Sequence, residues 1–285
     1  MNNQRRHIAN RHPCFSTQAS INRGRIHLPI SPVCNIQCRF CKRTFNKTEN
    51  RPGVSACLLK PQEAVSYIKN ALELCPEISV IGIAGPGDPL ASSHALHTFR
   101  LVSQHFPQMI NCLSTNGLLL EHYALDLFLA GVQTVTVTVN AVDPALLEHI
   151  CAYIIVDGIR YEGYEGAALL IEAQKRGIQK AADLGMFIKI NTVLIPPLNG
   201  DHITDIARTA GSLGAGIINI IPLIPQHEFA DFQAPDCIDL KLAREASEEF
   251  LPVFRHCRHC RADACGILGK KDLFASQVEQ NFSHG

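Results

Sequence analysis

Three cysteines stand close together in the segment SPVCNIQCRFCKR, at positions Cys34, Cys38 and Cys41, and no fourth cysteine follows nearby. Three thiolates on one short loop can bind three irons of a 4Fe-4S cubane and leave the fourth iron open to a small-molecule ligand. Zinc with a fourth ligand from elsewhere, or a cubane closed by a distant cysteine, is the alternative. We interpret the spacing as an iron–sulfur site with one open iron.

A second set of cysteines lies near the two ends of the chain. Cys14 is part of RHPCF, with His7 and His12 close to it, and Cys257 and Cys260 form a CxxC pair. Two thiolates and two such groups suit a structural zinc site. Arginines crowd the same segments: Arg11, Arg255, Arg258 and Arg261. Positive charge lowers the pKa of thiols and favours an anionic, sulfide-rich cluster. We therefore expect further iron–sulfur clusters here, with zinc as the alternative.

A regular alternation of strand and helix patterns must position these groups. Apolar, β-branched runs bounded by Gly, Pro or Asn predict strands at 25–32, 78–85, 111–117, 134–140, 187–195 and 216–225. Amphipathic stretches predict helices at 61–74, 93–105, 121–130, 144–154, 166–185, 201–213 and 238–251. Such alternation is typical of a parallel sheet covered by helices. The predicted fold is α/β, a partial (β/α)6 TIM-like barrel at 25–226 with cysteine-bearing arms at 1–24 and 227–285.

The ends of the predicted strands carry polar and glycine residues. In this fold, active-site groups lie at the carboxyl ends of the strands, and the three-cysteine loop directly follows the first strand. The other strand-end candidates are Gly85, Gly87, Asp88, Ser114, Asn116, Asn140, Asn191 and Thr192. Each of them taken alone suits a turn or a strand end equally well. Together they predict a ligand cradle at the mouth of the barrel.

The composition excludes several classes of protein. The 285 residues hold 26 Lys and Arg and 26 Asp and Glu, and this zero net charge argues against bulk binding to nucleic acid or an anionic membrane. No apolar run reaches the roughly 18 residues of a membrane span. The basic N-terminus lacks the apolar part of a secretory signal, so we expect a cytoplasmic protein. Twelve cysteines there indicate metal or redox chemistry, although Cys75, Cys151 and Cys237 stand singly and are interpreted as buried or incidental.

The three-cysteine loop, with Phe40 beside its last cysteine, resembles that of the radical S-adenosylmethionine (SAM) enzymes. In that family the amino and carboxylate groups of SAM occupy the open iron. The resemblance implies that Gly85, Gly87 and Asp88 receive the methionine amino group. It also implies that the other polar strand-end residues bond the ribose hydroxyls or the carboxylate: Ser114, Asn116, Asn140, Asn191 and Thr192.

More specific motifs resemble the radical SAM domain of the NifB family of nitrogenase cofactor maturases, in its stand-alone form. They are HPCFS, HLPISPVCNIQCRFCKR, NRPGV, VIGIAGPGDPL, CLSTNG, VTVTVNAVDP, VLIPPLN, IIPLIP and CRHCRADACGILG, in order from residue 12 to about 270. The resemblance implies an enzyme that fuses two 4Fe-4S precursor clusters, adds a sulfide and inserts a carbide derived from a SAM methyl group. Its product is the 8Fe-9S-C core of the nitrogenase cofactor, and one further SAM is cleaved to a 5′-deoxyadenosyl radical.

The NifB resemblance also assigns residues and partners. Cys34, Cys38 and Cys41 would hold the SAM cluster. Cys14, Cys257 and Cys260, with His12 or His7, would bind precursor clusters. Cys112 would act near the site of methyl transfer, unless it is a buried strand cysteine, and Glu165 would relay protons, unless it lies in an exposed acidic loop. The implied partners are cluster donor and carrier proteins and a reductant such as ferredoxin or flavodoxin.

One departure from the NifB pattern leaves the product open. The family carries one more cysteine shortly after the loop, where this chain reads CKRTFNKTENRPGV. Cys57 or Cys265 could substitute, or Asn46, a histidine or a sulfide could complete the site. The chain could also use only one precursor cluster. Two other functions therefore stay open: a divergent radical SAM enzyme with auxiliary clusters acting on another substrate, or a non-catalytic iron–sulfur scaffold.

Overall fold

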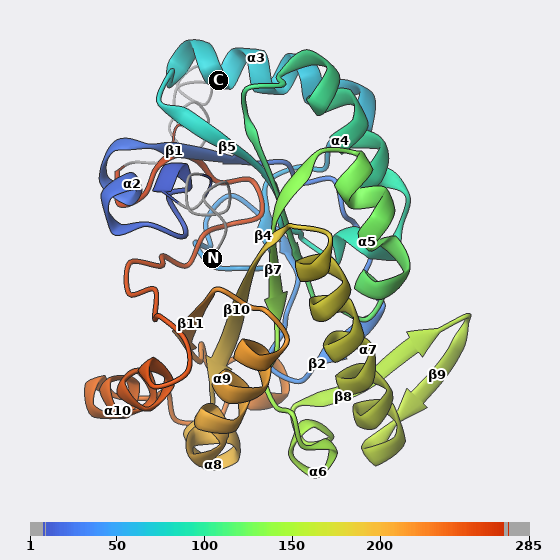
Figure 1. Ribbon diagram of the computed structural model, residues 1–285, viewed down its shortest axis with the longest axis vertical. Coiled ribbons are helices and arrows are strands. Elements are labelled where there is room, and N and C mark those ends of the chain that lie inside the picture. Colours follow the sequence, from blue (N-terminus) through green and yellow to red (C-terminus); the bar gives the residue numbers. More distant parts are fainter. Residues whose placement is uncertain (1–7, 9, 271–272, 274–285) are drawn as a thin grey trace, which may run out of the picture.

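Six parallel strands form an open, curved sheet in the computed structural model, which describes residues 8, 10–270 and 273 (Figure 1). The sheet order is β11-β10-β7-β6-β5-β1, with β12 (Cys265–Ile267) antiparallel beside β1. The parallel strands are β1 (Gly24–His27), β5 (Ile78–Ile83), β6 (Ile110–Thr115), β7 (Val132–Thr138), β10 (Phe187–Leu194) and β11 (Ile217–Pro222). Each of the six predicted strands is present, so the predicted partial barrel is confirmed.

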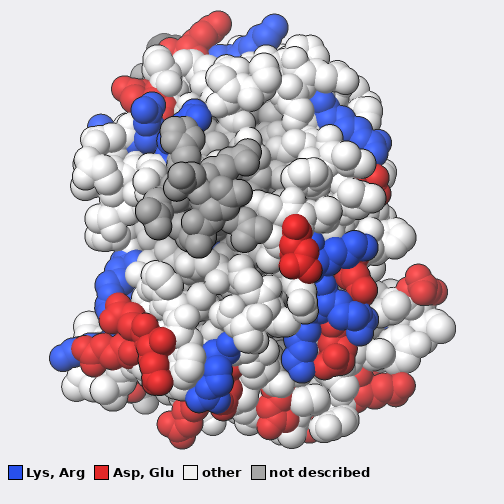
Figure 2. Space-filling model, viewed as in Figure 1, with Lys and Arg blue, Asp and Glu red and all other residues white. Residues whose placement is uncertain are grey.

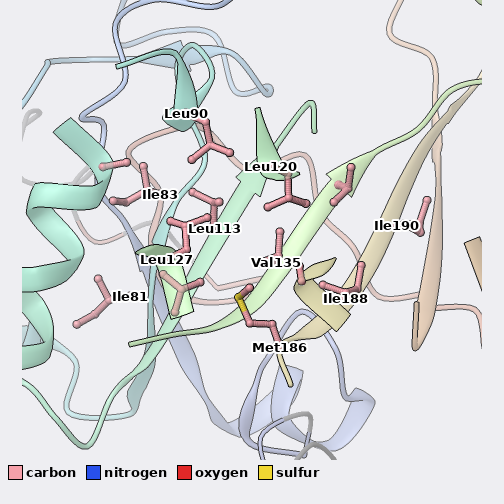
Figure 3. Close-up of a cluster of buried hydrophobic side chains, with 14 of the residues drawn as sticks. Ile81, Ile83, Leu90, Leu113, Leu120, Leu127, Val135, Met186, Ile188 and Ile190 are labelled. Atoms are coloured by element: carbon pink, nitrogen blue, oxygen red, sulfur yellow. The ribbon is translucent and has the colours of Figure 1, made fainter. Parts of the chain in front are cut away.

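Helices cover the outer face of this sheet. They are α3 (Ala64–Leu74), α4 (His94–His105), α5 (Leu120–Leu129), α7 (Gly163–Asp183) and α9 (Ile203–Ser212). Figure 3 shows strand residues such as Leu113, Val135 and Ile188 directed at helix residues such as Leu127, and all four are essentially unexposed. Burial of this apolar layer, at about 25 cal/mol per Å², is the main stabilising contribution to the fold.

The inner face of the sheet is polar. Because side chains alternate along a strand, the neighbours of the core residues point away from the helices. These inner residues are Arg25, His27, Cys112, Ser114, Thr134, Thr136, Lys189, Asn191 and Asn219. A parallel strand in a purely structural sheet is apolar on both faces. The polar inner face is therefore where ligand chemistry is expected.

One predicted helix is wrong over most of its length. The stretch 144–154 forms only the short α6 (Pro144–Leu147) and then continues as β8 (Cys151–Val156), which turns back as β9 (Ile159–Glu162). β-Branched and aromatic residues favour the strand. Asp157 and Gly158, with φ of 50° and 80°, form the two-residue turn. β8 pairs with β2 (Ile36–Cys38), so this hairpin supports the three-cysteine loop.

The remaining segments pack around the barrel. The short elements are α2 (Thr17–Asn22), β3 (Thr44–Phe45), β4 (Val54–Ser55), η1 (Pro61–Glu63), η2 (Pro89–Ala91), α8 (Pro196–Asn199), η3 (Gly200–His202), η4 (His227–Phe229) and α10 (Cys237–Glu248). Figure 2 shows acidic and basic side chains interspersed over the visible face, in keeping with the zero net charge. Among the described helices, none combines the length and apolarity that crossing a bilayer requires.

Candidate functional site

The three-cysteine loop is held in shape by its own contacts. Cys34 precedes β2, Cys38 ends it, and Cys41 follows a turn; all three side chains are half-buried. The Gln37 side-chain amide donates to the carbonyl oxygens of Cys38 and Cys41, each at 2.9 Å, and the Cys41 N–H donates to the Cys38 carbonyl at 3.0 Å. Protein hydrogen bonds therefore fix the backbone between Cys38 and Cys41. Sequence analysis did not identify Gln37, because a side-chain amide that bonds nearby backbone carbonyls has no recognisable sequence pattern.

The glycine-rich segment after β5 contacts this loop directly. The N–H groups of Gly87 and Asp88 donate to the carbonyl oxygens of Ser31 and Val33, at 2.7 and 2.8 Å. A Cβ at Gly87 would lie 2.0 Å from the Val33 oxygen, so only glycine permits this approach. The N–H groups of this segment, which was expected to receive the SAM amino group, thus dock the loop onto the sheet. The Gly85 carbonyl accepts from the Ser31 N–H at 3.4 Å.

Asp88 connects two strand ends. Its buried carboxylate accepts from the Leu90 N–H, the Thr115 hydroxyl and the Asn116 N–H, the last at 2.6 Å. Burial raises the pKa of this carboxyl, and the hydrogen bonds it accepts act in the opposite direction. The Asn116 amide in turn donates to Asn35 Oδ1 at 2.7 Å. Asp88 therefore sets the position of Asn116.

The other polar strand-end residues divide into two groups. Asn140 Oδ1 accepts from the Val193 N–H at 3.0 Å, and the Thr192 hydroxyl donates to the Val139 carbonyl at 2.8 Å. Both of these side chains join neighbouring strands. Ser114 lies half-buried on the inner face, and so does Asn191, which accepts from the Asn219 amide at 3.0 Å. Ser114 and Asn191 thus face the space that a ligand would occupy.

The chemistry around the loop fits a cluster held by three thiolates. Asn116 Nδ2 lies 3.8 Å from Cys34 Sγ, a weak N–H···S contact. Two buried polar atoms beside the loop, Asn35 Nδ2 and Ser31 Oγ, have no partner within the described part of the chain. Burial raises the pKa of Cys34 to about 11, so metal binding there must displace a proton. The loop thus combines three soft donors with unused hydrogen-bonding groups.

The second set of cysteines gathers around Arg25 and Lys189. Arg25 donates to Cys260 Sγ at 3.2 Å. Lys189 Nζ donates to the Cys14 carbonyl at 2.9 Å. Burial raises the pKa of Cys14 to about 12, the Lys189 and Arg25 charges oppose this, and the Cys260 and Cys257 thiols are close enough to contribute. The structure thus brings Cys14, Cys257 and Cys260 together, although no three His, Cys, Asp or Glu side chains of the described residues converge on a single-ion site.

Cys112 lies on the inner face in one row with His27. The strand register aligns His27, Gly82, Cys112 and Thr134 across β1, β5, β6 and β7. The His27 ring lies over Gly82, since a Cβ there would be 3.1 Å from the ring carbon Cδ2. Cys112 and Cys14 both pack against the aromatic cluster that contains Phe187. Burial raises the pKa of Cys112 to about 11. Cys112 is therefore placed between the sheet and the second set of cysteines.

His12 is arranged as a hydrogen-bond donor. Its ring is 1% exposed, and its Nδ1 accepts from the Cys14 N–H at 3.1 Å. The proton of the neutral ring therefore sits on Nε2, which has no partner among the residues described. Burial and the nearby charges of Lys189 and His27 hold its pKa well below the usual value. As a metal ligand His12 would have to change tautomer and lose the Cys14 contact. His7, the other candidate, lies outside the described residues.

The candidates for the missing cysteine lie beside the segment that follows Cys260: Arg261 donates to the Asn46 carbonyl at 2.8 Å, and Asp263 accepts from the Ala56 N–H, next to Cys57, at 2.5 Å. Cys57 is exposed, and Asp263 and Arg261 are among the charged groups that influence its thiol. Cys265 is completely buried in β12 within the main hydrophobic core. The Asn46 side chain is used in a local turn, where it accepts from the Glu49 N–H at 2.8 Å. Of the three, Cys57 therefore has the side chain most accessible to a ligand beside this segment.

Glu165 is exposed in the first turn of α7. Glu162, just before that helix, forms an ion pair with Arg160 at 2.5 Å. A carboxylate in a first helical turn is stabilised by the helix dipole. This placement matches the alternative of an exposed acidic segment at the start of the helix.

Two charged residues of the site were missed by the sequence analysis. Arg25 and Lys189 lie within predicted strands, in GRIH and FIKINTV, and both are buried. A cation at an inward position of a buried strand is costly unless it has a partner. A Lys or Arg at an inward position of a predicted buried strand could therefore have indicated a binding site for a negatively charged group.

Comparison with known proteins identifies the family. Residues 28–210 match the Radical SAM superfamily. The FeMo cofactor biosynthesis protein NifB of Methanocaldococcus infernus is 47% identical over 269 residues, covering 94% of this chain and 89% of that protein. NifB of Azotobacter vinelandii is 37% identical, covering 91% of this chain and 53% of that protein.

Solved structures agree on the fold. SuiB of Streptococcus suis, bound to S-adenosylmethionine, has a TM-score of 0.57 at 12% identity over 80% of this chain and 49% of that chain. Methylornithine synthase (PylB) has a TM-score of 0.55 at 13% identity over 87% of this chain and 68% of that chain. The chain therefore belongs to the NifB family of FeMo cofactor biosynthesis proteins, radical SAM enzymes that use a 4Fe-4S cluster and SAM.

Proposed function

We propose that this chain builds the iron–sulfur core of the nitrogenase cofactor. It fuses two 4Fe-4S precursor clusters, which are its substrates, and inserts a carbide taken from a SAM methyl group to form the 8Fe-9S-C core. The observation that carries this proposal is the arrangement of thiols around one polar face. The three-cysteine loop is held by its own hydrogen bonds, Cys112 lies on the inner face of the sheet, and Cys14 and Cys260 come from the N- and C-terminal arms beside Lys189 and Arg25.

The resident cluster is held by Cys34, Cys38 and Cys41. When bound, it supplies the electron that cleaves SAM to methionine and a 5′-deoxyadenosyl radical. Gln37 keeps the three thiolates in position, and Asn116 donates toward the Cys34 sulfur. Ser114 and Asn191, and the unused donor on Asn35, are proposed to bond SAM.

The precursor clusters are proposed to bind over the inner face. Cys14, Cys257 and Cys260 supply thiolates, while the buried charges of Arg25 and Lys189 offset the negative charge of a sulfide-rich substrate. His12 donates its free Nε2–H to a cluster sulfide. Cys112, paired with Gly82 on the inner face, meets the precursor that receives the methyl carbon.

The second precursor is held more weakly than the first. Cys265 is buried in the core and the Asn46 side chain is engaged in a local turn, which leaves exposed Cys57 as the one thiol available to replace the family cysteine after the loop. A cluster with fewer soft anionic ligands exchanges more easily. We therefore expect one precursor to be lost first on dilution.

The reaction requires partners of defined chemistry. A low-potential electron donor such as ferredoxin or flavodoxin reduces the resident cluster, and cluster donor and carrier proteins deliver the precursors and accept the product. These partners belong to the cytoplasm, where we place the chain. No nucleic acid or membrane is needed.

Anaerobic reconstitution of the full chain tests this function. We expect about 12 irons per chain, the content of three cubanes, and formation of both 5′-deoxyadenosine and S-adenosylhomocysteine from SAM. Cys112→Ser should retain deoxyadenosine formation from the resident cluster and lose carbide insertion. Cys237→Ser, at an exposed position of α10, is the matched control. Deoxyadenosine without S-adenosylhomocysteine would indicate an organic substrate, and no SAM cleavage would indicate a scaffold.

A further inference from the structure

A fourth thiol lies directly against the three-cysteine loop. Cys151 is the first residue of β8, and the antiparallel register of β2 and β8 pairs it with Cys38. Its side chain is 5% exposed and packs in the same hydrophobic cluster as Cys34 and Cys38. The sequence, in which Cys38 and Cys151 are far apart, indicated only an incidental cysteine.

The backbone geometry of this pair is suited to a disulfide. The Arg39 N–H donates to the Ile150 carbonyl at 2.9 Å, on one side of the Cys38–Cys151 pair. Cys38 and Cys151 thus face each other just after a register shift between Gln37 and Cys38. Residues opposed across antiparallel strands have Cα atoms about 4.5–5.5 Å apart. Disulfides join residues whose Cα atoms are roughly 4.4–6.8 Å apart. Directly opposed residues also point to the same face of the sheet.

We propose that Cys38 and Cys151 form a disulfide in the metal-free chain, and that this bond excludes the resident cluster. Each thiol loses its hydrogen as the S–S bond forms. The two electrons and two protons pass to a small-molecule disulfide such as oxidised glutathione, which is reduced to two thiols. The thiolate of half-buried Cys38 attacks oxidised glutathione and expels one glutathione thiol, and the Cys151 thiolate then attacks the Cys38 sulfur of the mixed disulfide and expels the second.

Exclusion of the cluster follows from the coordination chemistry. A disulfide sulfur is not a thiolate, so oxidised Cys38 cannot bind iron, and Cys34 and Cys41 alone leave the cluster with two ligands. In the loaded enzyme the Cys38 sulfur is occupied and the disulfide cannot form. The pair thus protects an empty loop from irreversible oxidation and releases it under reducing conditions. This consequence, though not the disulfide itself, rests on the proposed function of the loop.

Disulfide mapping of the metal-free full chain tests the proposal. The chain is equilibrated anaerobically with mixtures of reduced and oxidised glutathione and digested without reductant. We expect a linked peptide containing Cys38 and Cys151, which is absent from Cys151→Ser and from Cys151→Ala and present in the control Cys237→Ser. Absence of that peptide across the whole range of mixtures, or linkage of Cys38 to Cys34 or Cys41 instead, overturns the proposal.

Cluster uptake separates this inference from the proposed function. Iron and sulfide are added to oxidised protein, with and without prior reduction, and iron content is measured. We expect oxidised wild type to take up at least fourfold less iron in the loop site than reduced wild type, and Cys151→Ala to show no such difference. Equal uptake by oxidised and reduced wild type overturns the exclusion. If the linked peptide forms but reduced protein also takes up no cluster, the disulfide stands and the function proposed for the loop fails.

Discussion

The two cysteine sets are built in opposite ways. The three-cysteine loop is local: its thiols lie within eight residues, and the Gln37 amide holds them through contacts one and four residues away. The second set depends on long-range contacts, such as Arg25 with Cys260 and Lys189 with Cys14, which span 235 and 175 residues. Ligands on one short, hydrogen-bonded loop suit a cofactor that stays bound. Ligands spread over separate segments suit a substrate that must enter and leave.

The charged residues around the two sets of cysteines also differ. Around the second set, buried Arg25 and Lys189 provide fixed positive charge. Around the loop, the nearby cations are Arg43 and Arg51, which lower the pKa of Cys41 against the effect of its burial. The fixed charges of Arg25 and Lys189 would attract an anionic ligand to the several thiols of the second set. Arg43 and Arg51, beside the loop, only adjust the pKa of a cysteine that the loop already holds in place.

Gly87→Ala should break the local frame and gives the largest expected effect. The new Cβ would lie 2.0 Å from the Val33 carbonyl oxygen and would push the loop off the sheet. We expect a loss of about 4 kcal/mol in the free energy of unfolding and no stable loop cluster. Gly200→Ala is the control, because nothing lies within 4 Å of a Cβ there. Urea unfolding and iron content measure both effects; wild-type values for Gly87→Ala would contradict the docking role.

Lys189→Met should damage the second set and spare the loop. It removes a buried cation and leaves the Cys14 carbonyl without its donor, at a cost of about 2–3 kcal/mol. We expect iron content to fall by the amount bound in the second set, while deoxyadenosine formation from SAM persists. Exposed Lys180→Met is the control. Equal loss of both kinds of cluster would show that the two sets are not independent.

Gln37→Glu should weaken the loop without removing a cysteine. The carboxylate cannot donate to the Cys38 and Cys41 carbonyls, and we expect about 2 kcal/mol of destabilisation. The resident cluster should then be lost to an iron chelator several-fold faster, with little change in the second set. Gln62→Glu, at an exposed position, is the control. An unchanged rate of chelation would mean that the amide does not hold the loop.

Acidification should lower the free energy of unfolding partly through His27, which lies near the second set of cysteines. Burial, followed by the Arg25 charge, lowers the pKa of His27 to about 4. Because this histidine is neutral when folded and protonates more readily when unfolded, its stability contribution is full above pH 6.5 and declines as the pH falls toward 4. We expect His27 to contribute a loss of about 1 kcal/mol between pH 8 and pH 5.5 in the metal-free chain. His27→Gln should reduce the slope by that share and leave the part due to other buried groups such as His12, whose pKa is also lowered; an identical pH profile would exclude His27 as a contributor.

The parts of the molecule that sequence could predict are those set by neighbouring residues. The six strands follow from β-branched runs, and the loop cysteines from their spacing. The hairpin at 151–162 was missed although its Asp157–Gly158 turn was readable, because the apolar run before it also fits a helix. The partners of Lys189 and of Cys38 were out of reach, because strand order and register decide them over more than a hundred residues.

The antiparallel edge strand β12 imposes an order on biosynthesis. It joins the sheet beside β1, the earliest strand, and it follows Cys257 and Cys260 directly in the chain. A ribosome translates these segments after the six parallel strands of the barrel, which can begin to fold earlier. A nascent chain can thus shape its Cys34–Cys41 loop before Cys257 and Cys260 exist to join Cys14, so the two sets of cysteines are completed at different times.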